Sequence, residues 1–100
     1  MSSNREQNKS SWTFLTNHAH VLLCLVNSPY MRMRDIANEV GITERAVQRI
    51  IADLRDEGYI DLHRHGRCNS YNINTEQRLK HPIEAHRSIA DLIQLIYKTD

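Results

Sequence analysis

Side chains between positions 44 and 49 carry the hydrogen-bonding groups that can recognise base edges in a DNA major groove. An arginine can bind O6 and N7 of guanine through two hydrogen bonds, and a glutamine can bind N6 and N7 of adenine in the same way. Arg45, Gln48 and Arg49 therefore predict a base-reading surface. Glu44 stands at its edge and could accept from a cytosine amine or stabilise a helix N-terminus. The alternative for the arginines is the solvated side of an amphipathic helix.

A second basic cluster surrounds position 66. Arg64, His65 and Arg67 flank Gly66, and glycine permits a tight turn. Arginine at such a tip can lie along phosphates or enter a narrowed minor groove, where the negative potential is concentrated. Histidine adds a weak, pH-dependent phosphate contact. Three further residues are predicted to contact phosphates and to orient the base-reading helix without recognising sequence, namely Thr43, Arg32 and Arg34.

The base-reading side chains need a helix, and the sequence around them predicts two short helices joined by a tight turn. Ala37 is small where the second helix must approach the first, and Gly41 can adopt the positive φ at which the first helix stops. Ile42 is expected to fill the angle between the helices, and Thr43 to cap the second helix with its hydroxyl. That helix is predicted to run to about position 57, with Gly58 as its stop.

On a helical wheel the base-reading groups lie opposite the apolar residues of the same helix, which are Val47, Ile50, Ile51 and Leu54. The segment MRDIANEVGITERAVQR, from Met33 to Arg49, resembles the helix-turn-helix of winged-helix transcription regulators such as the MarR-like and ArsR-like repressors. The resemblance covers about residues 14 to 75. It implies a regulator that binds double-stranded DNA sequence-specifically and represses by covering an operator.

Flanking patterns complete the predicted fold. Apolar residues at spacings of three and four predict a first helix from Trp12 to about Asn27, and alternation predicts one short strand over Tyr30 to Met33. After the helix-turn-helix the period changes to two, which predicts a β-hairpin with its tip at Arg64 to Asn69. A last helix is predicted over about His81 to Lys98, with Pro82 allowed in its first turn.

These elements predict a mainly α (α+β) chain, a winged helix-turn-helix with a short β-hairpin wing and a C-terminal dimerisation helix. Residues 1–11 are expected to form a flexible tail, residues 12–80 the DNA-binding domain and residues 81–100 the dimerisation helix. The last helix is apolar over more of its circumference than one small domain can cover, so a partner is expected. The residues predicted to bind a second copy are Ile89, Leu92, Ile93 and Ile96. The alternative is a helix that folds back and closes a monomeric core.

Composition narrows the choice of partners and location. A chain of 100 residues with 40% apolar content makes one small core. Lys and Arg number 13 and Asp and Glu 12, so attraction to nucleic acid must come from local segregation of charge. Cys24 and Cys68 lack a CxxC spacing and predict reduced thiols in a cytoplasmic protein. The longest apolar run, positions 21–26, has six residues and is too short for a signal peptide or a membrane span.

Other functions have weaker signals. His20 and Cys24 lie four residues apart on one helical face and could give two Zn²⁺ ligands, which would make the protein a metal-responsive repressor. Cys24 stands in an apolar run, however, and is expected in the core, so no metal or other cofactor is predicted. No nucleophile stands beside a histidine in a recognisable catalytic setting, and no enzymatic activity is predicted.

A winged helix can also be a protein-interaction module in a larger assembly. Such a module would keep the apolar core but would not need the four arginines at positions 45, 49, 64 and 67 together. This basic set favours double-stranded DNA as the partner, together with a second copy of the chain. A small-molecule effector is compatible with the sequence, which does not identify one.

Overall fold

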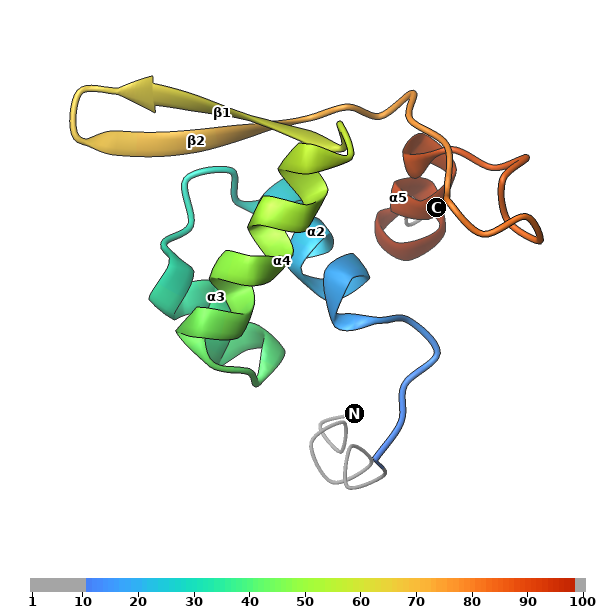
Figure 1. Cartoon of the computed structure of the whole chain (residues 1–100), viewed down its shortest axis with the longest axis horizontal. Helices are drawn as coiled ribbons and strands as arrows, with labels where there is room; N and C mark the ends of the chain where they lie inside the picture. Colours follow the sequence, from blue (N-terminus) through green and yellow to red (C-terminus); the bar gives the residue numbers. More distant parts are fainter. Residues whose placement is uncertain (1–10, 99–100) are drawn as a thin grey trace.

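The computed structural model describes residues 11–98 of the chain. In this range four helices and a two-stranded antiparallel hairpin form a winged helix-turn-helix, as predicted (Figure 1). The elements in chain order are α2 (Asn17–Asn27), α3 (Met33–Val40), α4 (Glu44–Asp56), β1 (Ile60–His65), β2 (Cys68–Ile73) and α5 (Ile89–Tyr97). The predicted flexible tail, residues 1–11, lies almost entirely outside the described residues.

The turn between α3 and α4 is formed as the sequence predicts. Gly41 has a φ of 88°, and the N–H groups of Gly41 and Ile42 both donate to the carbonyl of Ala37, at 2.8 and 3.1 Å. These bonds satisfy a carbonyl that the end of α3 would otherwise leave unpaired. The Thr43 hydroxyl accepts from the N–H of Ala46 at 3.0 Å and caps α4. The turn therefore fixes where α4 begins.

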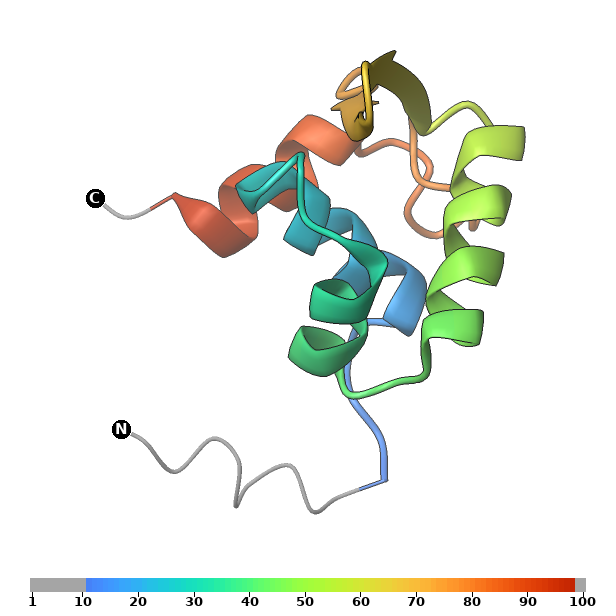
Figure 2. The same ribbon diagram turned by 90° about the vertical axis from the view of Figure 1, so that its left-hand side faces the viewer.

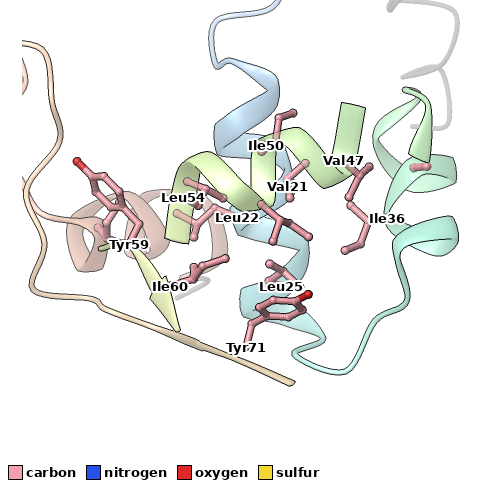
Figure 3. Packing of buried hydrophobic residues seen from close by; sticks show 13 residues of the cluster. Val21, Leu22, Leu25, Ile36, Val47, Ile50, Leu54, Tyr59, Ile60 and Tyr71 are labelled. Atoms are coloured by element: carbon pink, nitrogen blue, oxygen red, sulfur yellow. The ribbon is translucent and has the colours of Figure 1, made fainter. Parts of the chain in front are cut away.

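The core lies between α2, the helix-turn-helix and the base of the wing. Figure 3 shows Ile50 and Leu54 of α4 near the apolar residues Val21 and Leu22 of α2, and Val47 near Ile36 of α3. The largest fully buried side chains are Leu25, Ile36, Ile60, Val21 and Val47. Burying an aliphatic side chain of this size contributes about 1.5–3 kcal/mol, so this cluster holds α4 in a fixed orientation.

The wing is a hairpin whose base packs on the core. β1 pairs antiparallel with β2, with Leu62 opposite Tyr71 and His65 opposite Cys68. Only Gly66 and Arg67 stand between the strands, so the tip is tighter than the predicted segment from position 64 to 69. Gly66 has a φ of 62° and Arg67 has a negative φ, which is the pattern of a type II′ turn. The tip can therefore project as a compact β-ribbon.

A glycine follows the end of α4, and the segment after the wing forms a hydrogen bond to that glycine. Gly58 has a φ of 81°, and its N–H donates to the carbonyl of Arg55 at 3.1 Å, while the N–H of Tyr59 donates to Leu54 at 2.8 Å. This is a Schellman arrangement, and it confirms the predicted glycine stop. The side-chain amide of Asn74 donates to the carbonyl of Gly58 at 3.1 Å. The start of the wing is thus held against the end of α4.

The first helix is shorter than the sequence predicts. α2 begins at Asn17 rather than at Trp12, because Thr16 caps it by accepting from the N–H of Ala19 at 3.3 Å. The segment before the cap leaves two large aromatic side chains in solvent, with Trp12 62% and Phe14 91% exposed. The apolar spacing that predicted a longer helix therefore does not correspond to a buried helical face.

The last helix is also shorter than predicted. α5 begins at Ile89 instead of His81, because Ser88 and Asp91 form a capping box in which each side chain accepts from the other residue's N–H. Pro82 lies in a loop and not in the first turn of the helix. The N–H of Leu79 donates to the carbonyl of Arg87 at 3.0 Å and closes the ends of this loop.

The predicted strand over Tyr30 to Met33 is absent. A single hydrogen bond connects the neighbouring turn to the wing, from the N–H of Tyr71 to the carbonyl of Pro29 at 3.3 Å. α3 begins at Met33, which is the last residue of the predicted strand, so the residues before it are too few to form a strand ladder.

Candidate nucleic-acid interface

The predicted base-reading groups occupy the exposed side of α4. Arg45, Gln48 and Arg49 are all exposed. Ala52 is exposed on the same side, and its small side chain projects less from the helix than theirs do. Glu44 is exposed in the first turn of the helix. Figure 2 shows α4 along one side of the molecule and α5 on the opposite side, with α2 and α3 between them. No other described helix therefore covers the polar side of α4.

The charges near α4 are segregated by contacts with other elements. Asp53 forms an ion pair with His18 of α2 at 2.9 Å, and Glu57 forms one with Lys80 at 3.1 Å. Both acids stand late in the helix or just after it. Between residues 11 and 98, neither Arg45 nor Arg49 forms an ion pair. The exposed start of α4 thus keeps its positive charge in a chain whose net charge is only +1.

The residues predicted to contact phosphates are placed around the start of α3 and α4. Arg34 and Thr43 are exposed, and the hydroxyl hydrogen of Thr43 can still be donated because its oxygen is the capping acceptor. Arg32 is exposed, but its Nε lies 3.4 Å from Asp35. This exposed pair is weak and can rearrange, although it reduces the free charge of Arg32.

The wing tip carries the second predicted basic cluster. Arg64, His65 and Arg67 are all exposed, and Arg64 pairs across the hairpin with Asn69. Neighbouring residues of a strand point to opposite faces, so Arg64 and His65 present their side chains on different sides of the ribbon. The tip can therefore contact a phosphate backbone on either face, and the exposed amide of Asn69 adds a polar group that the sequence pattern did not single out.

The residues predicted to bind a second copy divide between the core and the surface. Ile89 is only 3% exposed and packs in the core of a single chain, so it offers little surface to a second copy in this structure. Leu92 and Ile93 are half-buried, and Ile96 is 42% exposed. The Tyr97 hydroxyl donates to the carbonyl of Leu23 at 2.9 Å and ties the end of α5 to α2. α5 therefore closes the core with one face and leaves another face open.

The described part of the chain contains no cluster of three or more His, Cys, Asp or Glu side chains able to hold a metal ion. His20 contacts Asn17 through its Nδ1, 3.1 Å from the amide oxygen. Burial raises the pKa of the Cys24 thiol above its usual value, and the nearby Glu39 carboxylate raises it further. A raised pKa lowers the fraction of thiolate, which is the form that binds zinc.

No helix among residues 11–98 is long and apolar enough to cross a membrane.

Comparison with known proteins agrees with this geometry. Residues 15–81, two thirds of the chain, match the family described as the Crp-like helix-turn-helix domain. The match spans α2, the helix-turn-helix and the complete wing, and ends before α5. No curated protein matches the chain. The match supports a winged helix-turn-helix that binds DNA, whereas the resemblance to MarR-like and ArsR-like regulators stays a prediction.

Proposed function

Because the chain belongs to the Crp-like helix-turn-helix family, we propose that it is a cytoplasmic transcription regulator that binds double-stranded DNA sequence-specifically as a homodimer. The observation that carries the proposal is the exposed side of α4, where Arg45 and Arg49 have no ion-pair partner among residues 11–98 and flank Gln48. Arginines that served only to solvate a helix surface would be free to pair with acids along the same helix.

In the proposed complex, the first turns of α4 enter the major groove. Arg49 binds guanine through O6 and N7, and Gln48 binds adenine through N6 and N7. Arg45 reads a neighbouring base or its phosphate, and Glu44 accepts from a cytosine amine. The small side chain of Ala52 lets the helix approach the base edges closely.

Contacts to the backbone would set the register of the helix. Arg34, Arg32 and the free hydroxyl hydrogen of Thr43 face phosphates beside the groove. The wing tip contributes Arg64 and Arg67, with His65 as a weaker pH-dependent contact. These contacts do not depend on base identity, so they contribute to affinity on every sequence.

A homodimer would extend the interface over two successive major grooves of the DNA. Two copies of α4 about 34 Å apart reach successive major grooves on one side of the duplex and match a near-palindromic site. Occupying such a site would block transcription, so the proposed effect is repression by covering an operator. No ligand-binding domain is needed for this activity.

The proposal is tested by fluorescence anisotropy on a random duplex pool and on the site selected from that pool, from about 50 to about 200 mM salt. Arg49→Ala should weaken binding to the selected site about 10- to 100-fold and leave random-sequence binding almost unchanged. Arg67→Ala should weaken both by a similar factor. Lys98→Ala, which removes a cation at the end of α5, is the control and should have little effect.

Equal losses from Arg49→Ala on selected and random duplexes would contradict the base-reading role of α4. Absence of binding at the lowest salt concentration would overturn the DNA-binding proposal and favour a protein-interaction module. A steep loss of affinity with salt, combined with the selective effect at Arg49, would support it.

A further inference from the structure

We infer that a second copy of this chain docks on an apolar groove beside α5 and inserts its Phe14 into it, while receiving Phe14 of the first copy in return. The inference deepens the proposed homodimer and rests on it. It differs from the predicted dimer, because the anchor is an aromatic segment before α2 rather than the face of α5 alone.

The groove is formed where α2, the end of α4 and α5 meet. One hollow of about 290 Å³ lies there, with a mainly apolar wall that includes Leu22, Leu54 and Ile89. A second hollow continues along α5 as far as Leu95. Both hollows are lined by Leu79 and Leu92, so they lie side by side, and together they are called the α5 groove. Apolar surface of this kind gains free energy when a partner covers it.

An aromatic projection stands at the edge of the α5 groove. The rings of Trp12 and Phe14 pack edge to face, with centroids 5.0 Å apart and an angle of 82° between their planes. Phe14 lines the mouth of the first hollow, yet 91% of it remains exposed. The Trp12 ring supports the Phe14 ring from one side, which limits the freedom that docking would remove. An exposed and partly ordered aromatic side chain of this kind is a typical interface anchor.

A second copy of the chain fits the hollow, because the projection and the hollow lie on one surface patch. A two-fold dimer uses the same surface patch on both subunits, so a projection and a hollow within one patch can each pair with the other's equivalent on a second copy. An apolar cavity of about 150 Å³ can hold benzene. The first hollow, of about 290 Å³, therefore has room for a phenylalanine ring. Its lining includes Lys80 and Glu84. Lys80 pairs with Glu57 of its own chain, so this exposed pair must rearrange before Lys80 can face Glu84 of a second copy.

Docking here would leave the candidate DNA interface open. Arg45, Gln48 and Arg49 line neither hollow, and the wing tip lies outside both. Two copies joined at the α5 groove can therefore keep both recognition helices exposed. The groove instead contacts α4 near its end, through Leu54, so dimer formation would also support the position of that helix.

The test measures the oligomeric state of the full chain by sedimentation velocity, without DNA. Phe14→Ala removes the projection, and Leu92→Glu places a charge in the groove. Each should weaken dimerisation by at least about 100-fold, because a symmetric dimer loses the same contact twice. Tyr30→Ala removes an aromatic side chain that is 64% exposed and lines neither hollow, so it should leave the dimer unchanged.

Mixing the two variants gives the decisive measurement. The Phe14→Ala copy keeps the groove walls on α2, α4 and α5 and loses only the edge that its own Phe14 forms. The Leu92→Glu copy keeps an intact projection, so a mixed dimer regains most of one of the two contacts. At a concentration where each variant alone is monomeric, the mixture should form dimers. Circular dichroism checks that both variants are folded, and Leu95→Glu, at a residue 76% exposed, replaces Leu92→Glu if that variant is not.

A monomeric wild-type chain at tens of micromolar would overturn the inference, as would a dimer that neither substitution weakens. A mixture that stays monomeric would also overturn the inference, because Phe14 of one copy would then not bind the groove of the other. The groove would in that case be left for the chain's own Phe14 or for a small apolar molecule. DNA binding is measured separately on a duplex carrying one half-site. Loss of that binding with the dimer intact would refute the DNA proposal alone, whereas half-site binding by a monomeric wild type would refute only the dimer.

Discussion

Replacing Gly58 by alanine should destabilise the protein by more than the same change at Gly41, and by up to about 2 kcal/mol. Gly58 follows the end of α4 with a φ of 81°, and Gly41 follows the end of α3 with a φ of 88°. A side chain in this left-handed region costs about 1–2 kcal/mol, offset by about 0.4–1 kcal/mol because alanine restricts the unfolded chain. The backbone contribution is therefore about 1 kcal/mol at either position.

The two positions differ in what the new methyl group would meet. At Gly41 no heavy atom lies within 4 Å of the added Cβ, whereas at Gly58 the Cβ would lie 3.1 Å from Nε2 of Gln77. That nitrogen donates to the carbonyl of Glu57 at 3.0 Å. The end of the Gln77 side chain must therefore shift by a few tenths of an ångström, which weakens a hydrogen bond worth about 1 kcal/mol and sets the upper limit of the excess at Gly58.

Urea denaturation followed by circular dichroism gives the free energy of unfolding of each variant. Adding Gln77→Ala to both glycine variants isolates the contact, because Gly58→Ala should then cost no more than Gly41→Ala. Equal costs of the two glycine substitutions in the otherwise wild-type chain would refute the steric argument. An excess at Gly58 that persists without the Gln77 side chain would assign the effect to another contact.

Two further predictions concern titrating groups. Burial raises the pKa of Cys24 and so lowers its thiolate fraction. Iodoacetamide at about pH 8 should therefore alkylate the exposed Cys68 first. Peptide mass spectrometry measures the two alkylation rates, and equal rates would contradict the prediction. The backbone N–H of Ser88 donates to the Asp91 carboxylate and lowers its pKa, helped by Arg87. The stabilisation by this charge is present above the ordinary aspartate pKa of about 3.9 and is lost as the pH falls through the lowered pKa. The difference in Tm between wild type and Asp91→Asn should therefore be largest near neutral pH and disappear in acid, and a pH-independent difference would count against the capping charge.

The helix-turn-helix could be predicted because its determinants are local. The positive φ of Gly41 and the hydroxyl cap of Thr43 act within a few residues of the turn. The apolar period of α4 likewise decides which side of that helix is buried, and the predicted burial of Val47 and Leu54 is confirmed. The DNA contacts of the opposite side stay predictions, since they depend on a partner.

The electrostatics of the candidate site needed the tertiary structure. His18 and Asp53 are 35 positions apart, and their ion pair exists only because α2 packs beside α4. Lys80 similarly reaches Glu57 from the segment after the wing. No helical or strand period connects these residues, so the sequence pattern could not show that Asp53 and Glu57 are paired while Arg45 and Arg49 are not.

The ends of the chain show the same division. Sequence patterns determined that apolar residues occur at helical spacing around Trp12 and Phe14, and again between Ile83 and Ile96. Tertiary structure decided that Ile89 is buried while Phe14 stays in solvent. Spacing specifies only which side chains can share a face, whereas burial requires a second surface, supplied here by elements far away in the sequence.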